Sequence, residues 1–241
     1  MGFFHNLFDK VTSRFIAALM QEYEKREFHP HRLLLEQAQE EAAEYAERHM
    51  KTAVILKDQN EVLEFAITRV GNTGCVLEFG VAAGDSIRLI ADRFERPVHG
   101  FDSFEGLPED WGGRHEGKGH YSTNGQLPNV PSNVVLHKGW FESTLSSFVE
   151  ANDEAVAFLH VDCDLYSSTK TVLNLLAPRI KPGTVIVFDE YFNFVSWKDH
   201  EYKAFHEFVA EHRVTYEYLC WGYQQVAVVI REIAEREIPS A

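Results

Sequence analysis

The spacing of hydrophobic positions changes along this chain. Near the N-terminus, Phe4, Phe8, Val11, Phe15 and Leu19 recur every three or four residues, which places them on one face of a helix. From about residue 75 onward, short apolar runs alternate with amphipathic stretches. Strands that alternate with helices are typical of βαβ units and a mainly parallel sheet.

Seven apolar runs are predicted to be β-strands. Helical stretches around Ser86–Phe94, Glu142–Glu150 and Ser168–Ile180, together with a long loop, separate the first five. The last two runs are joined only by Trp221–Gln224, which is too short for a parallel crossover and predicts an antiparallel hairpin. We therefore expect an α/β fold with a mainly parallel seven-stranded sheet and a C-terminal antiparallel hairpin. The runs are Cys75–Phe79, Val98–Asp102, Val134–His137, Val156–Asp162, Val185–Asp189, Val214–Cys220 and Gln225–Ile230.

The chain is expected to divide into an N-terminal helical extension over residues 1–60 and an α/β domain over residues 61–241. The extension includes a second helical segment, Leu33–Met50, rich in Glu, Ala and Gln. Several large apolar side chains left on a surface mark an interaction site, so those of the extension should pack on something. The domain itself or a neighbouring subunit could supply that surface, and we expect a homodimer or larger homo-oligomer.

Composition limits the class of function. The 241 residues carry a net charge of −14, and a field of that sign repels phosphate backbones, so we expect no nucleic-acid partner. No apolar run approaches the roughly 20 residues of a membrane helix, and the N-terminus lacks the pattern of a secretory signal. The widely spaced Cys75, Cys163 and Cys220 fit reduced thiols. We therefore expect a cytoplasmic protein that does not bind membranes.

The loop after the first predicted strand is a candidate cofactor site. It contains Glu78, Gly80, Ala82 and Gly84 and leads to Ser86, at the strand edge where open parallel sheets bind ligands. The two glycines remove side chains where the backbone must turn and approach a ligand. Glu78 stands where a dinucleotide fingerprint has its first glycine, and a carboxylate there suits a cationic, phosphate-free cofactor. S-adenosylmethionine fits this description, and a plain strand–helix turn is the alternative.

Asp102 ends the second predicted strand. An acidic residue there is expected to accept hydrogen bonds from both ribose hydroxyls of a nucleoside cofactor, with an ordinary turn residue as the alternative. Other residues are placed to flank an adenine ring, although Trp140 could instead belong to the core. They are Ser103, Phe104, Gly139, Trp140 and Phe141.

Acidic residues follow the fourth and fifth predicted strands. Asp162 and Asp189 should emerge on the same edge as Asp102, with Glu190 next in sequence. Crowded carboxylates repel one another unless a cation or shared protons relieve them, and all-oxygen ligands favour Mg²⁺, Ca²⁺ or Mn²⁺. In the alternative, Asp162 binds the cofactor ammonium group, Asp164 caps the next helix and Glu190 faces solvent.

Two further features are less specific. The segment Gly112–Gly125 contains five glycines and is interpreted either as a substrate lid or as a floppy connection. The histidines in strand-like runs are expected to be satisfied core or edge residues, and those elsewhere are weak candidates for a base. The first group is His99, His137 and His160, and the second is His115, His120 and His200.

Several blocks of sequence resemble the macrocin O-methyltransferase family. They are Glu78–Gly84, Gly100–Pro108, Gly139–Leu145, Val161–Tyr166 and Val187–Tyr191, within a similarity from about residue 50 to about 230. The resemblance implies a Rossmann-like, class I S-adenosylmethionine-dependent methyltransferase that acts on a hydroxyl of a natural-product or sugar-like small molecule. It also implies a divalent metal, usually Mg²⁺, held by Asp162, Asp189 and Glu190. The family usually has two aspartates at the last pair, so Glu190 is a departure.

A metal that binds the acceptor hydroxyl would lower the pKa of that hydroxyl and orient it, with Asp162 as the candidate proton acceptor. Two other functions remain compatible with the sequence. One is a metal-independent methyltransferase acting on nitrogen, carbon or a carboxylate, and the other is a nucleotide-binding module or NAD(P) oxidoreductase. Glu78 argues against NAD, and no residue pattern reveals the acceptor.

Overall fold

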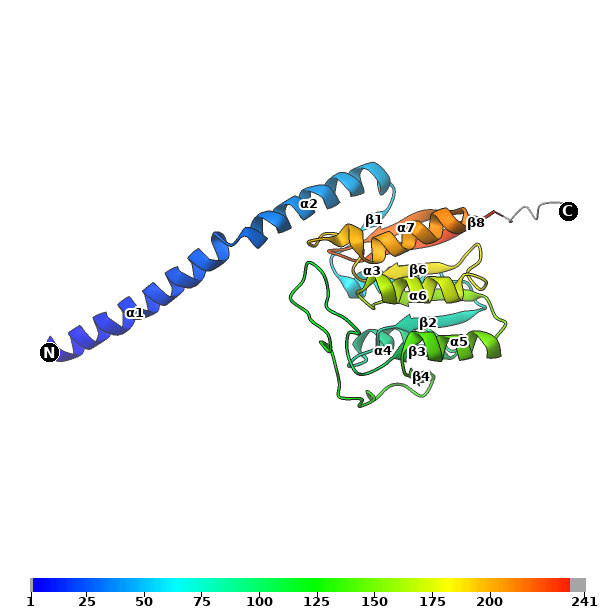
Figure 1. Cartoon of the computed structure of the whole chain (residues 1–241), viewed down its shortest axis with the longest axis horizontal. Helices are drawn as coiled ribbons and strands as arrows, with labels where there is room; N and C mark the ends of the chain where they lie inside the picture. The colour runs from blue at the N-terminus through cyan, green and yellow to red at the C-terminus, as the bar shows by residue number, and fades with distance from the viewer. Residues whose placement is uncertain (1, 235–241) are drawn as a thin grey trace.

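The computed structural model describes residues 2–234, with the backbone alone for residues 2–11, 13 and 26. One eight-stranded sheet organises the domain, in the order β1-β7-β8-β6-β5-β2-β3-β4 (Figure 1). The strands are β1 (Val54–Ile55), β2 (Cys75–Phe79), β3 (Val98–Asp102), β4 (Val134–Lys138), β5 (Val156–Val161), β6 (Val185–Phe188), β7 (Val214–Trp221) and β8 (Val226–Ile233).

Strand directions confirm the predicted fold class. The pairs β2–β3, β2–β5, β3–β4 and β5–β6 are parallel, whereas β8 runs antiparallel to both β6 and β7. The predicted C-terminal hairpin is therefore the pair β7–β8. The eighth strand, β1, has only two residues and pairs with the edge of β7, so it left no readable apolar run in the sequence.

Helices cover both faces of the sheet. α3 and α4 pack on one face around Val62 and Ile87, and α5, α6 and α7 pack on the other around Leu145, Leu173 and Phe205. α3 and α7 were not predicted from the sequence. The helices are α1 (Gly2–Glu27), α2 (Pro30–His49), α3 (Gln59–Ile67), α4 (Asp85–Ala91), α5 (Phe141–Ala151), α6 (Tyr166–Leu176) and α7 (Glu201–His212), with a 3₁₀ turn, η1, at Trp197–Asp199.

The second helix of the extension is docked on the domain. Ala38, Ala42 and Ala46, spaced four residues apart, form a buried stripe on α2. The Tyr45 hydroxyl lies 2.5 Å from that of Tyr218 on β7. These contacts tie α2 to the β7 side of the sheet.

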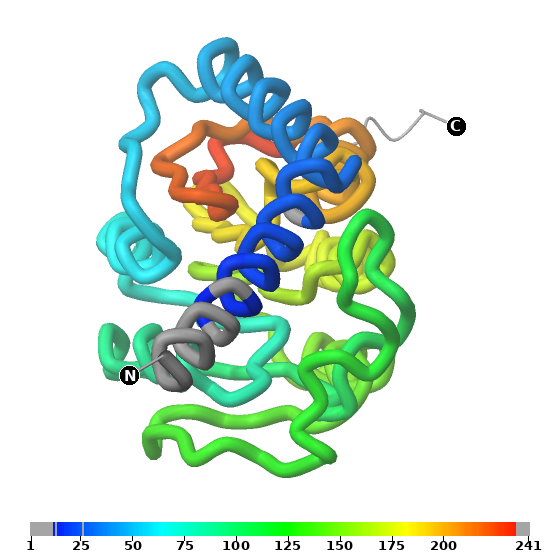
Figure 2. Tube along the Cα trace, turned by 90° about the vertical axis from the view of Figure 1, so that its left-hand side faces the viewer, coloured from blue at the N-terminus to red at the C-terminus, as the bar shows by residue number. Residues whose placement is uncertain are grey.

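The first helix projects away from the domain in Figure 1, and Figure 2 views the chain from the side on which this helix projects. Phe15 is 65% exposed and Leu19 is 54% exposed, so packing of this stripe on the chain's own domain is wrong for the described side chains. Phe4, Phe8 and Val11, predicted on the same face, lie outside the residues whose side chains are described. Packing against a neighbouring subunit stays a prediction.

Gly80 sits where the end of β2 crosses the end of β5. Its φ is +92°, and a Cβ built there would lie 1.7 Å from the backbone oxygen of Asp162. A change of rotamer cannot relieve a clash with backbone atoms, so only glycine allows the loop after β2 to lie this close to the backbone of Asp162. The close approach brings the β2 loop and the acid that follows β5 to one edge.

We expect Gly80→Ala to destabilise the protein much more than Gly183→Ala. Gly183 has nearly the same φ, +96°, but a Cβ there meets nothing within 4 Å. The left-handed backbone costs each alanine roughly 1–2 kcal/mol, and the clash should add at least about 3 kcal/mol at Gly80. Urea unfolding of both variants measures the difference. Equal losses would show that the two loops do not approach so closely.

Candidate active site

A cavity of about 560 Å³ opens at the carboxyl edge of the sheet. Loops that follow β2, β3, β5 and β6 form most of its wall. Gln59 of α3, Glu109 and Tyr121 of the long loop, and Asp164 also line it. Ten residues singled out in the sequence meet there: Gly80, Ala82, Ser86, Asp102, Ser103, Trp140, Phe141, Asp162, Asp189 and Glu190.

Four other predicted cofactor contacts lie behind the cavity wall. Glu78 is fully buried in the sheet, and Phe104 belongs to the hydrophobic core with 1% exposure. Gly84 caps α4, with Pro128 and Arg88 packed against it, and Gly139 occupies the turn before α5 with φ +144°. These four residues would therefore affect cofactor binding only indirectly, through the conformation of the loops to which they belong or against which they pack.

Asp102 lines the cavity and also holds the β2 loop together. Its Oδ2 accepts hydrogen bonds from the backbone N–H groups of Val81 and Ala82, at 2.8 and 2.7 Å. Its Oδ1 accepts one from the N–H of Phe104 at 2.6 Å. A carboxylate offers about four lone-pair sites, so these three bonds leave roughly one for a ligand. The expected pair of ribose hydroxyls would compete with the loop's own amides.

Two aromatic residues follow β4 at the cavity mouth. Trp140 is 42% exposed and lines the cavity, which excludes the alternative that it is a core residue. Phe141 also lines the cavity and packs edge-on against Phe79, with ring centroids 5.2 Å apart. A flat ligand ring could therefore rest on the exposed Trp140 indole, next to a phenyl ring that is held against Phe79.

Carboxylates gather where β5 and β6 end. Donor atoms of Asp162, Asp164 and Glu190 lie within 4.8 Å of one another, and Asp189 is close to Asp162 in a second group. The Oδ1 of Asp189 accepts a hydrogen bond from the side-chain amide of Gln59 at 2.6 Å. Glu190 is buried and its Oε2 has no hydrogen-bond partner, so the alternative that Glu190 faces solvent is wrong.

The crowding changes the acidity of the cluster. Desolvation, followed by repulsion from Asp189, raises the pKa of Asp162 and that of Glu190 well above their ordinary values. Desolvation likewise raises the pKa of Asp164 to about 7. Among the described lining residues of the cavity there is no Lys, Arg or His to offset this charge.

Asp164 and Gln59 are two of the site residues that sequence reasoning did not assign. Asp164 was considered as a helix cap, but α6 is capped by Leu165 without a side-chain bond. Asp164 is instead buried in the acidic cluster, in the left-handed region at φ +64°. The Asp-x-Asp spacing could have suggested it, whereas Gln59 lies on a helix that the sequence did not reveal.

The histidines divide differently from expectation. His99 on β3 and His137 on the edge strand β4 bond to each other at 3.0 Å. His160 is fully buried and bonds to Glu78, but its Nε2 has no hydrogen-bond partner, so it is not satisfied. The candidates for a base do not line the cavity: His200 bonds to the Gly112 carbonyl, and His115 and His120 are exposed.

The long loop between β3 and β4 is anchored and is not a floppy connection. Trp111 is buried against Phe194, and the Arg114 guanidinium stacks over the Trp111 ring. The His200 Nε2 lies 2.9 Å from the Gly112 oxygen. These contacts hold the loop in place, and Leu107, Pro108, Glu109 and Tyr121 of the loop line the cavity.

Comparison with known proteins gives a consistent result. Residues 77–191 match a family model described as a methyltransferase domain. The chain is 33% identical over 146 residues to the 8-demethyl-8-(2,3-dimethoxy-alpha-L-rhamnosyl)-tetracenomycin-C 4'-O-methyltransferase of Streptomyces olivaceus, covering 50% of this chain and 54% of that protein. It is 29% identical over 150 residues to the mycinamicin III 3''-O-methyltransferase of Micromonospora griseorubida, covering 54% and 55%. The chain thus spans about half the length of these curated relatives.

Solved structures share the fold. The calicheamicin methyltransferase CalS11 superposes with a TM-score of 0.57 at 22% identity, covering 70% of this chain and 76% of that chain. The O-methyltransferase NovP gives 0.53 at 22% identity, covering 72% and 78%. At this identity the likeness shows the fold alone, which is the Rossmann-like methyltransferase fold. The family model shows that residues 77–191 carry a methyltransferase domain, and the curated relatives support the resemblance to the macrocin O-methyltransferase family.

Proposed function

We propose that this protein transfers a methyl group from S-adenosylmethionine to a hydroxyl of a small molecule, with the help of a divalent cation. The observation that carries the proposal is the cavity in which the β2 loop, Asp102 and an acidic cluster meet at one sheet edge. The named relatives are O-methyltransferases of natural products, which supports a natural-product or sugar-like acceptor here.

The cofactor side of the cavity suits a cationic nucleoside. Asp102 would accept a hydrogen bond from the ribose, Ser103 and Trp140 would border the adenine, and the acids beyond Gly80 would face the sulfonium. Attraction between these carboxylates and a positive sulfonium supports S-adenosylmethionine over a pyrophosphate cofactor. S-adenosylmethionine supplies the electrophilic methyl group when it is bound.

The acidic cluster suits a cation. Asp162 lies within 4.8 Å of Asp189 in one group of donor atoms and of Glu190 in another. Glu190 has a buried oxygen without a hydrogen-bond partner, and carboxylates are ligands that hard divalent ions prefer. A bound dication would lower the pKa of an acceptor hydroxyl. Asp162, which lines the cavity between the β2 loop and Asp189, would take up the proton of that hydroxyl.

The acceptor side supports a ligand without phosphate. Glu109, Tyr121 and Ser167 line the cavity, and Glu109 accepts a hydrogen bond from the Ser167 hydroxyl at 2.6 Å. Eight of the described lining residues are acidic and none of them is basic, which disfavours nucleic acids and other polyanions. Hydroxyl-rich neutral molecules match this lining.

The projecting helix supports a homo-oligomer. Ile16, Leu19, Met20 and Tyr23 of α1 are all more than half exposed, so a second copy is our candidate for the surface that covers them. Among the described lining residues of the cavity, Gln59 of α3 is the first in the chain, so α1 and α2 do not line the pocket of their own chain. Among the described residues no helix is both long and apolar enough to cross a membrane.

Asp102→Ala should abolish binding of S-adenosylhomocysteine, because it removes the ribose acceptor and releases the three amides that shape the loop. Asp92→Ala, at the exposed end of α4, is the matched control. Calorimetry measures the affinity, and urea unfolding records how much stability the lost bonds cost. An affinity within about threefold of the wild type, or roughly 0.7 kcal/mol, would remove Asp102 from the cofactor site.

Chelation should suppress methyl transfer, and added Mg²⁺ or Mn²⁺ should restore it, with little change in the affinity for S-adenosylhomocysteine. The physical reason is that the cluster of Asp162, Asp189 and Glu190 acts on the acceptor and not on the nucleoside. Full activity in excess EDTA, after removal of metal is verified by elemental analysis, would favour a metal-independent methyltransferase.

Deleting residues 1–30 should convert a dimer or larger assembly into a smaller species in light scattering. The deletion removes α1 and leaves the buried alanine stripe of α2 on the domain. The double variant Phe15→Glu/Leu19→Glu should do the same, whereas Gln21→Glu should not. An unchanged mass for the truncated protein would show that α1 does not hold the assembly together.

A further inference from the structure

A buried histidine and glutamate form a pair beneath the acidic cluster. Glu78 on β2 and His160 on β5 are register partners in adjacent parallel strands, and both side chains are 0% exposed. The Nδ1 of His160 lies 2.9 Å from the Oε1 of Glu78. A carboxylate accepts but does not donate, so this bond keeps a proton on Nδ1 and leaves a lone pair on Nε2 of the neutral ring.

That lone pair has no protein partner. The Nε2 of His160 is buried and makes no hydrogen bond. A buried polar atom without a protein partner is open to a bound water or ion. A purely structural histidine in a strand would be expected to use both nitrogens.

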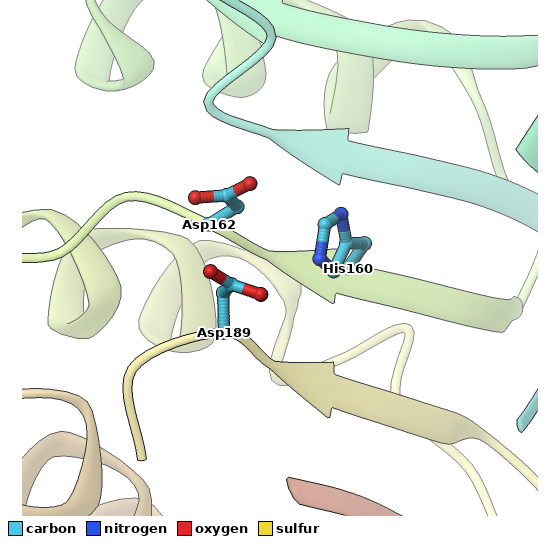
Figure 3. Close-up of side chains that lie close together, drawn as sticks. All are labelled: His160, Asp162 and Asp189. Carbon is cyan, nitrogen blue, oxygen red and sulfur yellow. The ribbon is translucent and has the colours of Figure 1, made fainter. Parts of the chain in front are cut away.

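The free nitrogen points toward two of the acids. Figure 3 shows the His160 ring beside Asp162 and Asp189, which emerge from the ends of β5 and β6. Donor atoms of the three side chains all lie within 4.8 Å of one another. Ligands about 2.1 Å from a shared ion lie no more than about 4.2 Å apart, so side-chain adjustments of roughly half an ångström would close the set around one ion.

We propose that His160 is a metal ligand, and that the cation site is a mixed nitrogen–oxygen site formed by His160, Asp162 and Asp189. The inference rests on the proposed function, which needs a cation, and replaces Glu190 by His160 in the donor set. It differs from the set of Asp162, Asp189 and Glu190 that the family resemblance implies. Glu190 falls instead in a separate group with Asp162 and Asp164.

Two outer contacts support this donor set. Glu78 orients the imidazole through Nδ1, which is the arrangement that carboxylates provide to metal-bound histidines. Gln59 holds the Oδ1 of Asp189 at 2.6 Å and leaves the other carboxylate oxygen for an ion. Both contacts hold the donors in place before any ion arrives.

The presence of an imidazole nitrogen among the ligands determines which divalent ions the site should prefer. Imidazole suits transition ions, whereas Mg²⁺ prefers oxygen ligands and near-ideal octahedral geometry. The site should therefore bind Mn²⁺ or Co²⁺ more tightly than Mg²⁺, by at least about tenfold. An all-acid site would show a smaller preference.

Pulsed electron paramagnetic resonance of the Mn²⁺-loaded full-length protein tests the ligand directly. The wild type should show nitrogen modulation from one imidazole. His160→Gln should lose that modulation and bind Mn²⁺ about 10–100-fold more weakly in calorimetry, with Mg²⁺ affinity changed less. His137→Gln, in a histidine pair away from the cavity, should match the wild type. Glu78→Gln keeps the imidazole and should weaken Mn²⁺ binding while retaining the modulation.

Absence of nitrogen modulation at full Mn²⁺ occupancy, its persistence in His160→Gln, or no Mn²⁺ binding at all would each overturn the proposal. Should His160→Gln fail to fold, the wild-type spectrum and Glu78→Gln still decide. Calorimetry with S-adenosylhomocysteine on the same preparations distinguishes failure of the histidine-ligand proposal from failure of the proposed function. Nucleoside binding without nitrogen modulation rejects only the histidine ligand, whereas no nucleoside binding by the wild type rejects the proposed function.

Discussion

The concentration of negative charge at one sheet edge is the constraint on which this site depends. Parallel strands end on the same side, and here β3, β5 and β6 each deliver an aspartate there. Carboxylates in a desolvated cluster repel one another, and the fold must offset that cost. The molecule can do so with backbone amides, with shared protons or with bound cations.

The structure offers a residue or group for each of these three ways to offset the repulsion between carboxylates. Backbone amides serve Asp102, and the N–H of Glu190 donates to the buried Glu201 at 3.0 Å. Desolvation raises the pKa of Asp162, Glu190 and Glu201, which favours protonated forms while no cation compensates them. A sulfonium cofactor and a divalent ion would each favour the charged forms of the nearby carboxylates. The same logic accounts for a cavity lined by acids without a basic residue among them.

Most residues at this edge of the sheet were predictable from the sequence. The spacing of hydrophobic residues and the positions where strands end are local properties of the chain. The apolar runs that end at Phe79, Asp102 and Phe188 predicted the carboxyl edge of the sheet. The acidic residues at or after these strand ends predicted the site. Partners across strands were not predictable. The pairing of Glu78 with His160 depends on the register of β2 against β5, which separates them by 82 positions in the chain. The capture of Asp102 by loop amides and the projection of α1 into solvent likewise depend on tertiary arrangement.

The central claim is that the cavity binds a phosphate-free, positively charged nucleoside cofactor. Thermal unfolding in the presence of S-adenosylmethionine or NAD⁺ tests it most directly. A ligand present at 100 times its Kd stabilises the folded state by about 2.7 kcal/mol, which raises the Tm measurably. We expect S-adenosylmethionine to raise the Tm with one site per chain and NAD⁺ to leave it unchanged. Stabilisation by NAD⁺ without stabilisation by S-adenosylmethionine would contradict this account.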